Sequence, residues 1–334
     1  MAIGEVMLGI DIGGTKCAAV LGTPGGEMVG RVPLPTDPRR PPAEIVAELV
    51  AAARGLLAAH GLPPAALRGI GVSCGGPLDH ESGVILRPPN LPLWDAVPIR
   101  ALLQEAFPGV QVEVENDANA TALAEWRWGA GRGCRSMVFV TMGTGIGGGL
   151  ILDGRLYRGA SGLAGELGHQ TILVNGPLCG CGKKGCLEAL ASGPAIARLA
   201  QDSLQYGRGR PLIQRAGGRA ADITARHVVE AARDGDAFAR GILAEVGGYM
   251  GIGLANVIQI LNPERIVLGT IAVHAGDLLL GPIRDAVAEF AWERSASACQ
   301  ILPAALGDRA QDLAALSLVS LNRGGGGGAL EHSG

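Results

Sequence analysis

The feature that most constrains the fold of this chain is a strand–glycine turn–strand unit that occurs twice. In the first copy, a buried strand at 6–11 leads into Gly13-Gly14-Thr15 and a returning strand at 17–22. The second copy follows roughly 130 residues later, with a strand at 137–142, a glycine turn at 143–149 and a returning strand at 150–152. Since 334 residues suffice for two lobes, we expect an α/β protein with one copy in each.

Glycine turns expose backbone N–H groups that can hold phosphate oxygens, so two such turns could grip one polyphosphate. Neither turn has the Rossmann spacing or the Gly-Lys-Ser/Thr ending of a Walker loop, and a glycine hairpin alone is usually only a hairpin. Asp11 precedes the first turn. A carboxylate beside a phosphate needs a cation between them, which makes Asp11 a candidate to hold Mg²⁺ through water. Lys16 either neutralises phosphate charge or faces solvent.

Composition and charge exclude several classes of function. The net charge of -3 and a pI near 6.1 give no basic surface for nucleic acid, and only 3% of the residues are aromatic. No window approaches 18 uninterrupted apolar residues, so we expect no membrane partner, and a strand close to the N-terminus leaves no room for a signal peptide. Four further cysteines are scattered along the chain, which predicts a reduced, cytoplasmic protein: Cys17, Cys74, Cys134 and Cys299.

Three cysteines separated by glycines form a C-x-C-x4-C cluster at Cys179, Cys181 and Cys186, and His169 lies ten residues upstream of it. Three thiolates and one imidazole make a complete tetrahedral zinc set. Ligands this close in sequence require tight turns, which glycines permit, often with φ > 0. Buried packing or a redox pair are the alternatives. We predict a closed, structural zinc site that organises chemistry nearby.

Two carboxylates accompany this cluster. Glu166 lies in Glu166-Leu167-Gly168-His169, and Glu188 follows the last cysteine. If one nitrogen of His169 binds zinc, the other carries the proton and becomes a fixed hydrogen-bond donor. One donor and two carboxylate acceptors suit a polyhydroxylated ligand such as a sugar. Each glutamate alone would be read as a solvated surface charge.

The dipeptide Asn116-Asp117 falls between a strand at 110–114 and a helix at 118–128. A helix N-terminus favours an ionised carboxylate, so Asp117 is a candidate base for a hydroxyl proton, with Asn116 binding a neighbouring hydroxyl. An ordinary helix N-cap is the alternative.

Apolar periodicity predicts the remaining elements. We expect helices at 43–60, 238–261, 282–292 and 313–321, strands at 70–74 and 265–268, and a proline-rich connection at 33–42. Four glycines in the long helix would permit close packing of a neighbour: Gly247, Gly248, Gly251 and Gly253.

With these segments assembled, the chain resembles the ROK family (repressors, open reading frames and kinases) of the sugar kinase/actin-like superfamily, most closely its glucokinase branch. The resemblance covers about residues 6 to 321, and its most specific segments are the 166–169 motif and the cysteine loop. It implies a two-lobed, actin-like/hexokinase-like ATPase fold. The expected small lobe is 1–117, rejoined by a helix at 305–321; the large lobe is 118–304, and 322–334 is a flexible tail.

The resemblance also implies residue roles. Asp117 is the catalytic base, and the sugar is bound by Gly76, Asn90, Asn116, Glu166, His169 and Glu188. Mg²⁺-ATP is bound through Asp11, Gly13, Gly14, Thr15, Lys16, Thr144, Gly145, Gly269 and Thr270. The last pair departs from the family, where a Gly-Gly pair is common. This departure puts some doubt on nucleotide affinity, although a small threonine should be tolerated there.

The implied activity is ATP-dependent phosphorylation of a hexose at its 6-hydroxyl, with glucose as the first choice. The alternatives are N-acetylmannosamine, N-acetylglucosamine or fructose as substrate. A sugar-responsive repressor of the same family is a different class, and we expect no helix-turn-helix because the first strand begins near residue 6. A homodimer or homotetramer is expected.

Overall fold

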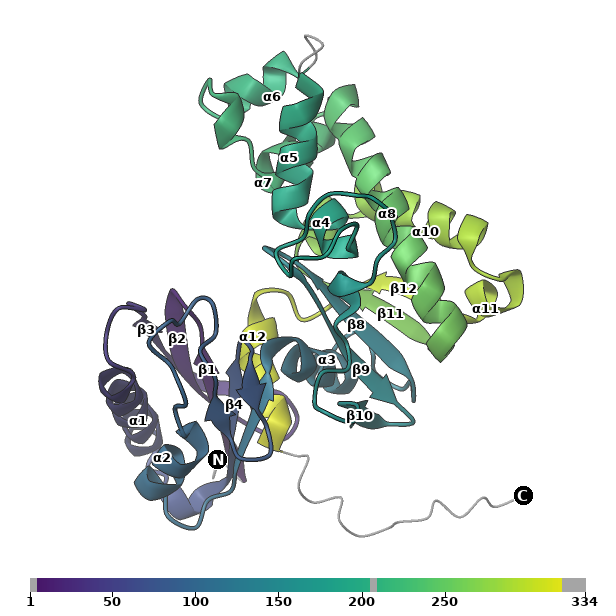
Figure 1. The fold of residues 1–334 in the computed structure, drawn as a ribbon. Helices are drawn as coiled ribbons and strands as arrows, with labels where there is room; N and C mark the ends of the chain where they lie inside the picture. Colours follow the sequence, from purple (N-terminus) through teal and green to yellow (C-terminus); the bar gives the residue numbers. More distant parts are fainter. Residues whose placement is uncertain (1–4, 205–208, 320–334) are drawn as a thin grey trace, which may run out of the picture. The chain divides into compact units, whose positions relative to one another are not determined.

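The computed structural model describes residues 5–204 and 209–319. It divides into two compact units, which we describe separately (Figure 1). Unit 1 is Met1–Trp128 with Asp308–Gly334, and unit 2 is Gly129–Gly307. The tail predicted at 322–334 lies outside the described residues.

Unit 1 is built on a five-stranded mixed sheet in the order β3-β2-β1-β4-β7. β1, β4 and β7 are parallel, while β2 and β3 add antiparallel strands at one edge. β1 is buried at every position, because helices cover both faces of the sheet. The elements of this unit are β1 (Val6–Ile12), β2 (Lys16–Gly22), β3 (Met28–Pro35), α1 (Pro42–Ala59), β4 (Leu67–Cys74), β5 (Leu78–Asp79), β6 (Val84–Ile85), α2 (Ile99–Ala106), β7 (Val112–Asn116), α3 (Asp117–Trp128) and α12 (Ala310–Leu318).

Strand β3 is a correction to the proline-rich connection predicted at 33–42. From Gly30 onward its residues alternate between half-buried and exposed, and it pairs with β2 on one side only. Pro33 and Pro35 are tolerated there because an edge strand does not need every N–H for pairing. The connection therefore begins only after Pro35.

Helix α12 returns to unit 1 and packs on β1, β4 and α3. The sheet admits it closely because two facing positions are glycines. A Cβ on Gly71 would lie 2.0 Å from the carbonyl oxygen of Ala315, and one on Gly9 would lie 3.0 Å from the Cβ of Ala315. Since α3 packs against α12, it belongs to unit 1, whereas the sequence analysis assigned residues 118–128 to the large lobe.

Unit 2 contains a second five-stranded mixed sheet in the order β10-β9-β8-β11-β12. β8 and β9 form an antiparallel hairpin, as β1 and β2 do in unit 1, which confirms the predicted repeat. The elements are β8 (Met137–Met142), β9 (Ile146–Leu152), β10 (Arg155–Tyr157), α4 (Leu187–Ala191), α5 (Gly193–Ser203), α6 (Arg210–Arg215), α7 (Ala225–Arg233), α8 (Ala237–Leu261), β11 (Arg265–Leu268), α9 (Ile271–Ala275), α10 (Asp277–Phe290), α11 (Glu293–Ala298) and β12 (Gln300–Pro303).

Helix α8 is the core helix of unit 2. A Cβ on Gly247 would meet Pro282 at 2.6 Å and one on Gly251 would meet Ala286 at 2.4 Å, so these glycines admit α10, as predicted. Gly253 similarly faces Leu187, whereas Gly248 has no neighbour within 4 Å. Within 5–204 and 209–319, α8 is the one helix long and apolar enough to span a membrane, and 61% of that apolar stretch is buried inside the protein.

The turn of the second hairpin is shorter than predicted. Gly147, Gly148 and Gly149 belong to β9 and pair with β8, leaving a turn at 143–145. A Cβ on Gly148 would lie 2.8 Å from the carbonyl oxygen of Gly165, and one on Gly168 would lie 2.2 Å from that of Ile146. These glycines let the 165–169 segment rest directly on the hairpin, which places Glu166 and His169 in unit 2 beside it.

Candidate active site and metal-ligand cluster

In unit 1, the predicted site residues gather where the parallel strands end. Asp11 pairs with Ser73 on β4, which pairs with Glu115 on β7, so the carboxyl ends of the three strands share one edge. Ligands of open α/β sheets bind at such an edge. A Cβ on Gly14 would lie 2.6 Å from Asn90, and one on Gly76 would lie 3.1 Å from Nδ2 of Asn116. The structure therefore brings the first turn, Gly76, Asn90, Asn116 and Asp117 together.

Asp117 opens α3 directly after β7. The N–H of Ala118 donates to Oδ1 of Asn116 at 2.9 Å and to Oδ1 of Asp117 at 2.8 Å. Buried Glu115 supports this junction by accepting the N–H of Asn116 at 2.9 Å and Nδ2 of Asn119 at 3.0 Å. The carboxylate of Asp117 remains accessible to solvent, yet the crowding protein atoms desolvate it and raise its pKa, while the Ala118 N–H acts to lower it. The sequence analysis therefore considered only the helix N-terminus, which has the smaller effect on the pKa of Asp117.

The first glycine turn is partly closed on itself. The N–H of Gly13 donates to the carbonyl oxygen of Lys16 at 3.1 Å, and the carbonyl of Thr15 accepts the N–H of Thr36 at 3.1 Å. Of the groups expected to hold phosphate, the N–H of Gly13 is therefore already bonded within the turn.

Asp11 is a buried carboxylate with a pKa raised to about 6. Desolvation is the largest cause, followed by the negative charges of Asp312 and Asp117, while Lys16 and Arg31 act in the opposite direction. Asp312 itself is buried and accepts Nε of Arg31 at 2.8 Å. The site thus holds a carboxylate that the protein alone does not neutralise, which suits a cation ligand.

Replacing Asp11 with Asn is expected to stabilise the protein at neutral pH. Because the folded-state pKa lies above that of the unfolded chain, protonated Asp11 favours the fold at low pH, and this contribution is lost as the pH rises from 3.8 to about 6. We expect the variant to gain about 1–3 kcal/mol in free energy of unfolding at pH 7.5 and much less at pH 4. Urea unfolding without Mg²⁺ or nucleotide measures this.

The matched control is Asp37→Asn. Asp37 has a pKa lowered to about 2, chiefly by its hydrogen bond from Arg39, so its ionised form favours the fold and its loss should not stabilise the protein at pH 7.5. An equal gain for Asp11→Asn at both pH values would contradict the buried-charge argument.

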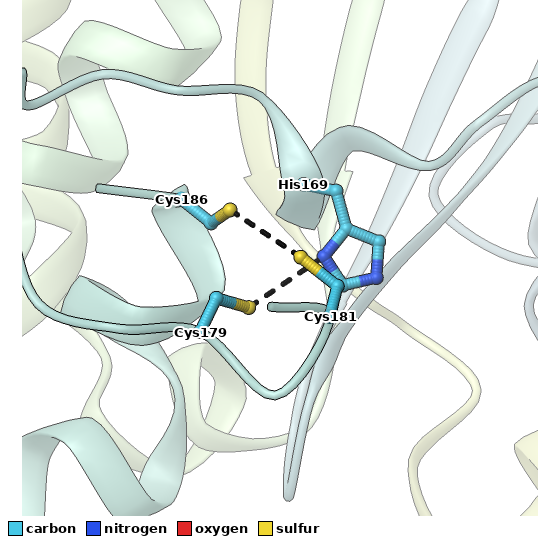
Figure 2. A group of neighbouring side chains, drawn as sticks. All are labelled: His169, Cys179, Cys181 and Cys186. Carbon is cyan, nitrogen blue, oxygen red and sulfur yellow. Dashed lines mark hydrogen bonds between the residues drawn. The ribbon is translucent and has the colours of Figure 1, made fainter. Parts of the chain in front are cut away.

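In unit 2, four predicted ligand atoms converge. One ring nitrogen of His169 and the three Sγ atoms all lie within 4.8 Å of one another (Figure 2). Sγ of Cys181 is 3.7 Å from Sγ of Cys186, and Sγ of Cys179 is 3.8 Å from Nδ1 of His169. These residues form a group that can hold a metal ion.

Glycines make the turns of this loop, as predicted. Gly182 has φ +83° and Gly185 has φ +73°. A Cβ on Gly185 would lie 1.7 Å from the carbonyl oxygen of Leu173, so the loop closes only with glycine there. The N–H of Cys179 donates to the carbonyl of Lys183 at 2.8 Å and completes the turn.

The two predicted acceptors differ in their surroundings. Glu166 is exposed, and its Oε2 lies 3.9 Å from Nε2 of His169, the ring nitrogen that faces away from the cysteines. Glu188, in the first turn of α4, accepts the N–H of Ile146 at 3.0 Å, while its other oxygen lies 3.6 Å from Sγ of Cys179. A Cβ on Gly145 would lie 2.6 Å from the Glu188 carboxylate. Glu188 thus links the cysteine loop to the β8–β9 hairpin. The sequence did not reveal this contact.

The glycine hairpin also lines a cavity of about 310 Å³ in unit 2. Thr144 lies in its wall, whereas Gly145 turns toward Glu188. The N–H of Gly193 donates to the carbonyl of Gly143 at 2.8 Å, which fixes α5 against the turn. The lining residues are Gly143, Thr144, Gly193, Pro194, Ala197, Thr224, Ala225, Arg226 and Ile271.

A second cavity of about 420 Å³ adjoins the first and shares Ala225, Arg226 and Ile271 with it. Its other lining residues are Val229, Glu230, Arg233 and His274. Because they share three lining residues, we refer to the two cavities together as the groove; only the first of them includes Gly143 and Thr144 of the glycine turn. Sequence reasoning missed the helical wall of this groove, although Ser192-Gly193-Pro194 and Thr224 are recognisable helix-start signals.

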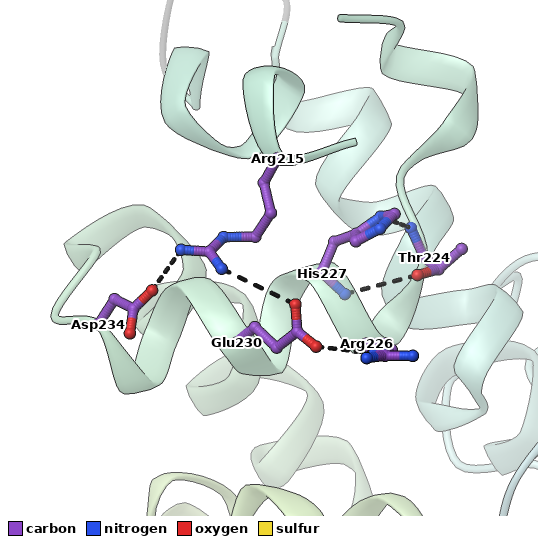
Figure 3. Close-up of polar contacts among 6 residues, drawn as sticks. All are labelled: Arg215, Thr224, Arg226, His227, Glu230 and Asp234. Carbon is purple, nitrogen blue, oxygen red and sulfur yellow. Dashed lines mark hydrogen bonds and ion pairs between the residues drawn. The ribbon is translucent and has the colours of Figure 1, made fainter. Parts of the chain in front are cut away.

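A polar network holds Arg226 in this wall (Figure 3). Its Nε donates to Oε1 of Glu230 at 2.7 Å, one helical turn further along α7, and Arg215 lies 3.8 Å from the other carboxylate oxygen of Glu230. Arg215 also pairs with Asp234. Thr224 and His227 form a capping box that fixes the start of α7.

Comparison with known proteins places these features in one family. The family model described as "ROK family" matches residues 7–321. The chain belongs to the ROK family. Two curated relatives are a glucokinase of Halalkalibacterium halodurans, 36% identical over 91% of both chains, and a xylose repressor of Caldicellulosiruptor bescii, 34% identical over 77% of this chain and 63% of the repressor.

Solved ROK structures share the α/β fold. The ROK hexokinase of Thermus thermophilus has a TM-score of 0.77 and 37% identity, covering 94% of this chain and 97% of that one. A ROK glucokinase of Streptomyces griseus, solved in complex with glucose and AMPPNP, has a TM-score of 0.77 and 33% identity, covering 94% and 98%.

Proposed function

We propose that this protein is an ATP-dependent hexokinase that transfers the γ-phosphoryl group of ATP to the 6-hydroxyl of glucose. The observation that carries the proposal is the near full-length similarity to glucokinases, together with the position of Asp11, Asn116 and Asp117 at the ends of the parallel strands of unit 1. Phosphoryl transfer depends mainly on positioning and charge neutralisation, with a base that accepts the hydroxyl proton.

Asp117 is the proposed base. Its raised pKa makes it a stronger proton acceptor than an ordinary surface carboxylate, and its accessibility leaves it open to a substrate hydroxyl. Asn116 fixes the start of α3 through its Oδ1 and leaves its Nδ2 beside Gly76. We assign Asn116, Gly76 and Asn90 to sugar binding.

In unit 2, His169, Glu166 and Glu188 are the proposed sugar ligands. With Nδ1 of His169 turned to the cysteines, Nε2 carries the proton and donates to a sugar hydroxyl. Glu166, close to this nitrogen, is placed to accept from a neighbouring hydroxyl.

The metal is proposed to be structural zinc. Tetrahedral zinc with Zn–S distances of ~2.3 Å separates neighbouring ligand atoms by ~3.8 Å. Two of the separations, 3.7 Å and 3.8 Å, are close to this value, and all four ligand atoms lie within 4.8 Å of one another, so binding zinc would draw the wider pairs together. Bound zinc would fix the tautomer of His169 and close the 179–186 loop.

The nucleotide is proposed to lie in the groove of unit 2, with its phosphates toward Gly143 and Thr144 and its base toward Arg226. Asp11 in unit 1 is the proposed partner of Mg²⁺, which neutralises phosphate charge when it is bound with ATP. Asp11→Asn should therefore reduce Mg²⁺-dependent turnover much more than glucose affinity.

A coupled ADP-release assay tests the function with glucose, mannose, fructose, N-acetylmannosamine and N-acetylglucosamine. We expect glucose to give the highest kcat/KM. A higher value for an N-acetylhexosamine or fructose would reassign the substrate while retaining the kinase. No ADP release with any sugar, combined with sugar-dependent binding to operator DNA, would instead support the repressor class represented by the Caldicellulosiruptor relative. A cytoplasmic location and a homodimer or homotetramer stay predictions.

A further inference from the structure

Thr270 has a backbone conformation that threonine rarely adopts. It follows Gly269 at the end of β11, and its φ of +51° and ψ of -109° lie outside the regions open to a β-branched residue. A glycine would adopt these angles without strain. Strained residues persist where surrounding contacts over-determine them, and they cluster at functional sites.

The contacts that hold Thr270 come from its side chain. Its Oγ1 accepts the N–H of Met142 at 2.9 Å and lies 3.2 Å from Oγ1 of Thr141. Just before this point, the N–H of Gly269 still donates to the carbonyl of Val140 at 2.8 Å. The Thr270 hydroxyl therefore replaces a strand carbonyl where β11 leaves the sheet, and it satisfies the backbone N–H of the fully buried Met142.

The hydrogen bond to Met142 matters because Met142 directly precedes the 143–145 turn. Met142 is the last residue of β8 and is followed directly by Gly143, whose N–H donates to the carbonyl of Gly145 at 2.9 Å. On the other side, Thr270 is followed by Ile271, which lines both cavities of the groove. The side chain of Thr270 thus connects the start of the 143–145 turn to the wall of the groove in unit 2.

We propose that Thr270 is a positioning residue for the phosphoryl donor: its hydroxyl fixes the β8 end of the 143–145 turn, and the strained backbone is retained for this bond. The inference rests on the proposed placement of ATP in the groove. It also reverses the doubt raised by the sequence, since the threonine that replaces a common glycine would support nucleotide binding.

Four substitutions separate this role from a merely structural one. Thr270→Val and Thr270→Ala remove the hydroxyl and keep the strain, so both should lower the melting temperature. Thr270→Gly removes the hydroxyl and relieves the strain, so it should melt close to the parent. Thr270→Ser keeps the hydroxyl. We expect the KM for ATP to rise about 10-fold in the Val, Ala and Gly variants, and Ser to recover most of this loss.

The glycine variant decides the matter, because a residue needed only for stability would show a parent-like KM for ATP once the strain is relieved. The KM for glucose should stay within about 2-fold of the parent in all four variants, since the hydroxyl acts on the donor side alone. Thr141→Val is the matched control: it removes the other hydroxyl but leaves the Met142 N–H its acceptor. Parent-like ATP affinity in Thr270→Gly would overturn the proposal, whatever the affinity of Thr270→Val.

Direct binding of Mg²⁺-AMPPNP, measured by calorimetry without sugar, keeps this test independent of turnover. If the parent binds the nucleotide but phosphorylates no sugar, the proposed function fails, while a 10-fold weaker affinity in Thr270→Gly still supports the role of Thr270. If the parent binds no nucleotide, both proposals fail.

Discussion

Asp117→Asn is expected to lower kcat by about 10²–10⁴-fold, the usual contribution of a positioned general base. The amide retains the size of the carboxylate and can still accept the N–H of Ala118, so α3 should start as before. The KM for glucose should change only a few-fold. In the parent, kcat should fall on the acid side as the raised pKa of Asp117 is crossed, because the protonated carboxyl cannot accept a proton. The variant should lack that acid limb.

Asp236→Asn provides the matched control. Asp236 is the N-cap of α8, and its carboxylate accepts the N–H of Ala239 at 2.8 Å, so it reports the loss of a charge that serves only as a helix cap. This variant should keep its kcat. If Asp117→Asn retained most of its turnover, as Asp236→Asn should, Asp117 would be no more than a cap.

The second large effect is expected from Cys181→Ser. Cys181 is an exposed member of the four-residue cluster, so its replacement removes a ligand without opening the core. We expect about one zinc per chain in the parent and much less in the variant, with a rise of at least about 10–100-fold in the KM for glucose. The physical reason is that His169 would lose the partner that fixes its ring and tautomer. Metal analysis and steady-state kinetics measure the two effects.

The KM for ATP should rise much less in Cys181→Ser, but the structure gives a route for a small change. Glu188 lies 3.6 Å from Sγ of Cys179 and accepts the N–H of Ile146, directly after the glycine turn. Cys299→Ser, a thiol of unit 2 outside the cluster, is the control and should retain its zinc. A zinc-free Cys181→Ser with an unchanged KM for glucose would separate the metal from sugar binding.

The parts that the sequence predicted best are those coded by local pattern. The buried strands β1 and β8 are largely apolar runs next to glycines, and the cysteine loop carries its three cysteines within eight positions. Strand β3 was missed because its edge position tolerates prolines, which argue against a strand when sequence is read alone.

The helical wall of the groove was missed for a different reason. Pro194, Thr224 and Arg226 come from segments separated in the chain, and only packing brings them to the turn at Gly143. The strain at Thr270 was equally inaccessible, since residue type gives no dihedral angle and its hydrogen bond joins positions far apart in sequence. Burial raises the pKa of Asp117 by more than the N–H of Ala118 at the start of α3 lowers it. This balance depends on the surrounding atoms, which the sequence does not give.

The return of α12 to unit 1 sets an order of events during synthesis. Unit 2 is one uninterrupted stretch, Gly129–Gly307, so all of its strands and helices have been made before α12 leaves the ribosome. Unit 1 must wait, because one face of its sheet packs against α12 at Gly9 and Gly71. Nascent chains expose that apolar face for the whole time unit 2 is being translated, which is the interval in which chaperones protect growing proteins from aggregation. The first strands of this protein to be made are thus among the last to be completed.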